Sequence, residues 1–288
     1  MSAVPAPKAR SRPLVTAYLV FYNLFSFVLW LRVFAGVVLY MLHGDSARQM
    51  MYATVAEAVQ RVLPAKVAGA LIEYGAYPPL AAAILRRASN LHDYIGPLVV
   101  ITQKLAVMEV VHAAVGWVRS NVLITAVQVM SRLIVVWGIS EKYEAAAHSP
   151  FYALMVCAWS LSEIARYPFY VNQLLRSPSF IALWARYSGF IVLYPLGVLG
   201  EVSLIYATLP VHRGWPWENL SAWSLRDLAF LALLPVYVPG LYVLYTRLLA
   251  SRRKVLGPDW AGTKARKEVQ QQKAAEFQRI RRLHEKKQ

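Results

Sequence analysis

A tyrosine and a glutamate lie in an otherwise almost entirely apolar stretch of the chain, LYPLGVLGEVSLIYATLP, residues 193–210. Tyr194 and Glu201 are seven residues apart. On a helix this is two turns, so the two side chains share a face and lie about 10 Å apart along the axis. A phenol and a carboxyl group spaced in this way can exchange protons with two parts of one substrate. The pair therefore indicates acid–base chemistry, with Glu201 as a proton donor or shuttle.

Residues beside this pair shape the helix that carries it. Pro195 has no N–H, and it therefore frees a backbone carbonyl one turn earlier. Gly197 and Gly200 have no side chain, which allows another backbone or a ligand to approach closely. The alternative explanation of the same residues is a kink combined with close helix packing, without any ligand.

Further polar side chains occur in pairs, three or four residues apart, within apolar segments. A charge at bilayer depth costs at least about 2.5–3.5 kcal/mol on insertion scales, so such residues pair, face a cavity or take part in chemistry. Residues at these spacings share a helix face, which predicts one polar chamber at the centre of a bundle. The alternative is structural pairing, in which the two arginines neutralise the two glutamates. The pairs are Glu109 with His112, Gln128 with Arg132, and Glu163 with Arg166.

The familiar nucleophile, nucleotide and metal motifs are absent from the sequence. It contains no GxSxG, no HExxH, no Walker loop and no GxGxxG in a strand–helix context. Its one cysteine, Cys157, permits neither an intrachain disulfide nor a cysteine-based zinc site. Only His112 falls in the predicted core. We therefore predict no metal and no bound cofactor. The histidines expected in solvated loops or in the tail are His92, His148, His212 and His284.

The composition is that of a multispanning membrane protein. Of the 288 residues 58% are hydrophobic and 16% are charged, and the mean hydropathy is +0.40, whereas about 25% of a soluble domain is charged. The net charge of +16 is concentrated at the ends: residues 251–288 contain twelve Lys or Arg and four Asp or Glu, and KARSR at 8–12 adds three basic residues. Basic ends around apolar spans follow the positive-inside rule, so we predict no nucleic-acid partner.

The apolar segments predict an all-α, polytopic membrane helix bundle with six transmembrane helices, because each segment can cross a hydrocarbon core of about 30 Å. An even number of spans places both basic termini on the same side, in the cytosol. The six spans are expected at about 14–42, 96–118, 121–140, 150–174, 180–208 and 226–249.

This arrangement divides the chain into a basic N-terminus (1–13), a membrane domain (14–250) and a basic tail (251–288) that is partly helical or disordered. The first connection, 43–95, is long. Within it, the segment 66–85 is long enough to span but contains Glu73 and a Pro-Pro pair, so it is predicted to be interfacial or partly inserted.

Three blocks of sequence resemble one family of membrane enzymes, the very-long-chain (3R)-3-hydroxyacyl-CoA dehydratases, which are also called protein-tyrosine-phosphatase-like. The resemblance covers about 97–250, with agreement in order, spacing and residue types. The blocks are MEVVHAAVGWVRSNVLITAVQVMSRLIVVWGI at 108–139, WSLSEIARYPFY at 159–170 and LWARYSGFIVLYPLGVLGE at 183–201.

The resemblance implies a six-span enzyme of the endoplasmic reticulum membrane. It would remove water from (3R)-3-hydroxyacyl-CoA to give trans-2-enoyl-CoA, the third step of fatty-acid elongation. The family's catalytic residues fall on Tyr194 and Glu201. As a working hypothesis, Tyr194 takes the C2 proton and Glu201 protonates the departing hydroxyl, although the sequence leaves the reverse assignment open. Residues that support activity in the family fall on Glu109, Gln128, Arg132, Arg166 and Gly197.

The resemblance also implies partner enzymes, and the sequence departs from the family in some features. Beyond membrane lipid and the acyl-CoA substrate, which brings its own CoA, it implies an elongase, a ketoacyl-CoA reductase and an enoyl-CoA reductase as partners. Phosphatase chemistry is not expected, because Glu163 stands where a Cys-x5-Arg loop would need arginine. The family's dilysine retrieval signal is imperfect here, with Glu285 and His284 at the fourth and fifth positions from the end. A transporter and an inactive scaffold of an elongation complex remain the alternative functions.

Overall fold

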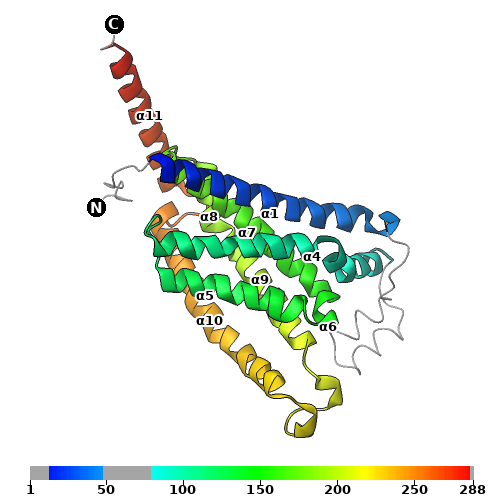
Figure 1. Cartoon of the computed structure of the whole chain (residues 1–288). Helices are drawn as coiled ribbons and strands as arrows, with labels where there is room; N and C mark the ends of the chain where they lie inside the picture. Colours follow the sequence, from blue (N-terminus) through cyan, green and yellow to red (C-terminus); the bar gives the residue numbers. More distant parts are fainter. Residues whose placement is uncertain (1–12, 48–78, 286–288) are drawn as a thin grey trace. The chain divides into compact units, whose positions relative to one another are not determined.

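The computed structural model describes residues 13–47 and 79–285, and within these ranges the chain is helical and contains no strand (Figure 1). The predicted all-α class is therefore confirmed. The elements in chain order are α1 (Pro13–Ala47), α4 (Pro79–Ala114), α5 (Val122–Leu133), the π-helix η1 (Ile134–Ser140), α6 (Glu144–Ala147), α7 (Pro150–Leu174), α8 (Phe180–Ser188), α9 (Phe190–Ala207), the 3-10 turns η2 (Val211–Arg213) and η3 (Leu220–Ala222), α10 (Leu225–Leu256) and α11 (Thr263–Glu285).

Five helical segments in the described ranges are long and apolar enough to cross a membrane, which supports a multispanning protein without confirming the predicted number of six. The predicted span at 150–174 forms helix α7 but is not among the five. Its serines, its tyrosines and the pair Glu163 and Arg166 lower its mean hydropathy. The five segments are Pro13–Gly44, Ala81–Ala114, Val122–Ser140, Phe190–Ala207 and Leu225–Leu256.

One predicted helix start is wrong, and one predicted span is divided. The second span was expected to begin at Gly96-Pro97, but α4 begins at Pro79 and runs through Pro97. Proline is favourable at the first position of a helix because it lacks an N–H, and an N–H at this position would have no partner within the helix. Proline is also tolerated inside spanning helices. The single span expected at 180–208 is divided into α8 and α9 at Gly189.

The long first connection is helical over its last part. Residues 79–85 of the predicted interfacial segment are the first turns of α4, and residues 66–78 lie outside the described residues. His92, which was expected in a solvated loop, also lies within α4. Its Nε2 is 2.8 Å from Glu141 Oε1, and its ring contacts the Tyr152 ring edge-to-face at 5.0 Å. This histidine therefore helps to join α4 to the segment after η1 and to α7.

The described chain forms two compact units, and α1, α7, α9 and α10 each contribute to both. One unit contains residues 13–28, 162–193 and 243–285, and the other contains residues 29–47, 79–161 and 194–242. In the second unit α4 and α5 lie side by side (Figure 1), with buried Ala106 of α4 packed against Val129 and Leu133 of α5.

The first unit contains the junction between α10 and the tail helix α11. The Arg252 side chain is 5% exposed; it donates to the backbone carbonyl of Trp260 at 2.9 Å and stacks on the Trp260 ring. Trp184 of α8 donates to the same carbonyl at 3.2 Å. Asp259 accepts hydrogen bonds from the hydroxyl and the N–H of Thr263, at 2.6 and 2.8 Å, which hold the pKa of this carboxyl below its usual value. The tail predicted to be partly helical therefore begins as a capped helix.

The carbonyl that Pro195 frees has a partner. Proline at 195 leaves the Ile191 carbonyl without its helical donor, and Tyr245 Oη donates to this oxygen at 3.2 Å. Tyr245→Phe is expected to destabilise the protein by about 1–3 kcal/mol, because it leaves a partly buried carbonyl without its hydrogen-bond partner. Thermal unfolding of the purified protein measures this loss.

The matched control for this prediction is Tyr187→Phe in the same unit. It also removes one phenol oxygen but keeps the ring that contacts Phe169 edge-to-face at 5.8 Å. If both variants unfold at the same temperature as the unmodified protein, the hydrogen bond to Ile191 contributes no stability.

Candidate active site

The Glu201 carboxylate is the meeting point of three helices. Glu201 lies on α9, and each of its oxygens has one partner from another helix. Trp159 Nε1 of α7 donates to Oε1 at 3.0 Å, and Tyr237 Oη of α10 lies 3.2 Å from Oε2. An apolar helix is therefore able to carry this acid because indole and phenol groups satisfy it.

Tyr194 belongs to the same neighbourhood. It is half-buried on α9, and it lies within electrostatic range of both Glu201 and Tyr237. Three ionisable side chains from two helices, Tyr194, Glu201 and Tyr237, are thus gathered in one unit of the chain. The predicted Tyr–Glu pair is accompanied by a second phenol.

Arg132 of α5 is a cation beside this site. Its guanidinium lies over the Trp159 ring, 5.3 Å from the ring centre, and within electrostatic range of Glu201. A cation over an indole face is attracted by the electron-rich ring. The indole that binds Glu201 is therefore held between the carboxyl group at its N–H edge and the Arg132 cation on its face.

The two glycines of α9 differ in how much room they leave. A Cβ added at Gly197 would lie 3.6 Å from Trp159 Cδ1, which is ordinary van der Waals contact. A Cβ added at Gly200 would lie 2.7 Å from Met155 Cβ and 2.9 Å from Met155 Cα, too close for a side chain to fit. Close approach of another backbone was predicted for both glycines. It requires glycine only at Gly200, where α9 contacts α7.

The pairing predicted for Glu163 and Arg166 is confirmed. Arg166 Nε lies 2.6 Å from Glu163 Oε2, and the Glu163 side chain is only 1% exposed. The Arg166 guanidinium also donates to Tyr167 Oη at 3.1 Å and lies over the Tyr167 and Tyr170 rings. This cluster belongs to the other compact unit, so a single polar chamber that includes Arg166 stays a prediction.

The remaining expected site residues lie on α4 and α5. His112 is buried, is within electrostatic range of Glu109 and stacks on Trp117, with ring centres 5.8 Å apart. On α5 the Gln128 side chain is exposed, whereas Arg132 one turn later is half-buried. Gln128 therefore does not share the burial of Arg132, although both were expected to face the interior.

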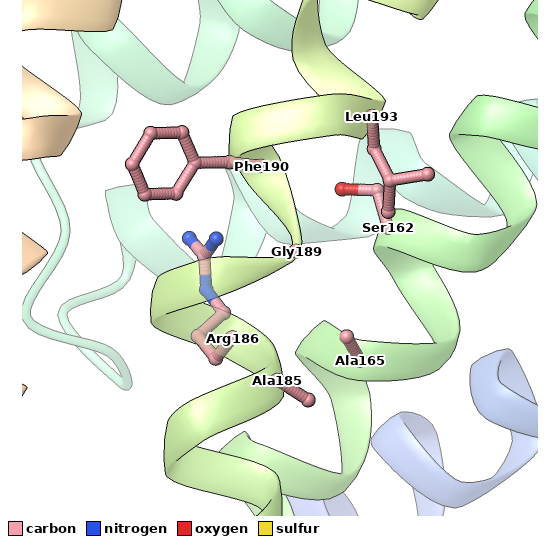
Figure 2. A pocket seen from close by; sticks show the side chains of 7 residues that line it. All are labelled: Ser162, Ala165, Ala185, Arg186, Gly189, Phe190 and Leu193. Atoms are coloured by element: carbon pink, nitrogen blue, oxygen red, sulfur yellow. The ribbon is translucent and has the colours of Figure 1, made fainter. Parts of the chain in front are cut away.

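A small pocket lies at the junction of α8 and α9 in the first unit. In Figure 2, Arg186 and Phe190 lie to one side of Gly189, and Ser162 and Leu193 lie to the other. Ala165 and Ala185 complete its lining.

Two residues that touch Glu201, Trp159 and Tyr237, were not predicted as site residues. An indole N–H in a spanning helix needs an acceptor, and this need was the available signal for Trp159. Tyr237 stands between Pro235 and Pro239 in α10, and no spacing rule connects it with α9. Among the described residues, no group of three or more His, Cys, Asp or Glu side chains is placed to hold a metal ion.

The fold and this site together define a class, that of polytopic helical membrane proteins with a cluster of ionisable side chains between their helices. Residues 103–258 match the family described as protein tyrosine phosphatase-like protein, PTPLA, and the chain belongs to this family.

Named relatives agree with this assignment. The chain is 33% identical over 250 residues to very-long-chain (3R)-3-hydroxyacyl-CoA dehydratase 2 of Mus musculus, covering 85% of this chain and 82% of the relative. It is 40% identical over 155 residues to a probable very-long-chain (3R)-3-hydroxyacyl-CoA dehydratase of Schizosaccharomyces pombe, covering 53% of this chain and 71% of the relative. The very-long-chain (3R)-3-hydroxyacyl-CoA dehydratase hpo-8 of Caenorhabditis elegans is 37% identical over 171 residues, covering 54% of this chain and 75% of the relative. No solved structure matches the chain.

Proposed function

We propose that this protein is a hydro-lyase that dehydrates (3R)-3-hydroxyacyl-CoA to trans-2-enoyl-CoA in fatty-acid elongation. The observation that carries the proposal is the Glu201 carboxylate, held by Trp159 and Tyr237 with Tyr194 in electrostatic range. Relatives named as dehydratases of this substrate class support the choice of reaction.

The elimination requires two proton transfers. One group takes a proton from C2, and the electrons of that C–H bond form the C2–C3 double bond. The other group gives a proton to the C3 hydroxyl, which leaves as water with the electrons of the C–O bond. In the working assignment Tyr194 takes the C2 proton and Glu201 gives the second proton. The two-turn separation on α9 lets Tyr194 and Glu201 contact different parts of one substrate, the C2 proton and the C3 hydroxyl.

The setting we propose is the endoplasmic reticulum membrane, with both termini in the cytosol. For this topology α7 is the sixth span: its 25 residues are about 37 Å long. Its buried Glu163 and half-buried Arg166 neutralise each other, which lowers the cost of placing them in the membrane. The substrate brings CoA, so the reaction needs no bound cofactor. An elongase, a ketoacyl-CoA reductase and an enoyl-CoA reductase are the proposed partners.

Tyr194→Phe is expected to lower turnover about 10²- to 10⁴-fold, the usual contribution of one acid–base group, while the protein stays folded. The measurement is formation of trans-2-enoyl-CoA from a long-chain (3R)-3-hydroxyacyl-CoA by the purified protein, followed by mass spectrometry. Tyr206→Phe, on the same helix, is the matched control and should retain turnover.

Two results would count against the proposal. Full turnover in Tyr194→Phe would remove this tyrosine from the chemistry. A folded unmodified protein that dehydrates no substrate across several chain lengths would favour a scaffold or a transporter instead.

A further inference from the structure

The two oxygens of Glu201 have partners of different chemistry. Trp159 Nε1 is 3.0 Å from Oε1, and an indole N–H can only donate a hydrogen bond. Oε1 is therefore an acceptor whether the carboxyl group is charged or neutral. In a protonated carboxyl group the carbonyl oxygen is the better acceptor, so this donor favours Oε1 as the carbonyl oxygen and Oε2 as the oxygen that holds the proton.

Tyr237 is placed at this second oxygen. Its Oη lies 3.2 Å from Oε2, and a phenol hydroxyl can either donate or accept a hydrogen bond. It donates to Oε2 when Glu201 is ionised and can accept from Oε2 when Glu201 is protonated. Tyr237 can therefore keep its contact with Oε2 through both protonation states, which Trp159 could not do in this position.

We propose that Oε2 is the oxygen through which Glu201 exchanges its proton, and that Tyr237 is the positioning residue that holds this oxygen. The inference rests on the proposed function and adds a third side chain to its site. In the working assignment the Oε2–H bond breaks and an O–H bond of the departing water forms, while the C2 proton goes to Tyr194. The hydrogen bond between Trp159 and Oε1 is kept throughout.

The surroundings of Tyr237 support this role. Tyr237 stands two residues after Pro235 and two before Pro239, both inside α10, and proline removes helical hydrogen bonds and bends a helix locally. Its hydroxyl also lies within electrostatic range of Tyr194. Tyr237 thus neighbours both proposed acid–base groups from a different helix.

The test is Tyr237→Phe, which removes a single oxygen atom. We expect kcat for a long-chain (3R)-3-hydroxyacyl-CoA to fall about 10- to 100-fold, the loss that corresponds to one hydrogen bond to a charged group. KM should stay within about twofold, because a residue that acts only on the transferring oxygen lowers kcat without weakening substrate binding.

The matched control is Tyr245→Phe. It removes a phenol oxygen from the same helix, but that oxygen binds the Ile191 carbonyl, so kcat should stay within about twofold even where unfolding occurs at a lower temperature. Unchanged kcat in Tyr237→Phe, or equal losses of kcat in both variants, would overturn the inference while leaving the proposed function intact. Absence of dehydration in the unmodified protein would instead refute the proposed function itself.

Discussion

Glu201→Gln is expected to abolish nearly all dehydration, with turnover lowered about 10²- to 10⁴-fold, while the helices stay assembled. Glutamine has the shape of glutamate, and its side-chain carbonyl can still accept the Trp159 N–H bond seen at 3.0 Å. It cannot take up or release a proton at the position of Oε2. The measurement is enoyl-CoA formation by purified protein, beside thermal unfolding of the same sample.

The control for this variant is Glu144→Gln, which neutralises an exposed acid in the first turn of α6 and should leave turnover unchanged. Wild-type turnover in Glu201→Gln would mean that Glu201 takes no part in proton transfer. A lower unfolding temperature with a proportional loss of turnover would mean that the carboxylate serves mainly to join α7, α9 and α10.

Gly200→Ala is expected to destabilise the protein by about 1–3 kcal/mol, the usual cost of overpacking a closely packed core. The added methyl group would lie 2.7 Å from Met155 Cβ, 2.9 Å from its Cα and 3.0 Å from its N. Two of these atoms belong to the backbone of α7, so a change of side-chain rotamer cannot relieve the clash. Thermal unfolding of the purified variant measures the effect.

Gly240→Ala on α10 is the matched control, because a Cβ built there has no atom within 4 Å. Alanine is also a better helix former than glycine by about 1 kcal/mol, so this variant should be as stable as the unmodified protein or more stable. Equal unfolding temperatures for Gly200→Ala and Gly240→Ala would show that α7 and α9 do not need to approach so closely.

Local features of the structure were predictable from the sequence where a single residue determines the backbone conformation. The free carbonyl expected one turn before Pro195 is present at Ile191, although its partner Tyr245 lies 54 residues away and could not be foreseen. The break at Gly189 and the start of α4 at Pro79 were missed, because apolar composition predicts the extent of a span better than its ends.

Only the part of the candidate site that lies on a single helix was predicted from the sequence. Tyr194 and Glu201 lie on one face of α9, and their seven-residue spacing is visible in the sequence. Trp159 and Tyr237 are 42 and 36 residues away from Glu201. Their contacts depend on how three helices pack, and periodicity within one helix contains no information about that packing.

The junction after α10 bears on how far the chain can be shortened from its C-terminal side. The family match stops at residue 258, two residues before Trp260, whose carbonyl and ring are bound by Arg252 and Trp184. A chain shortened to the matched residues would leave a buried guanidinium without these partners. Truncation should therefore keep Trp260, because the end of α10 is completed by residues that follow it.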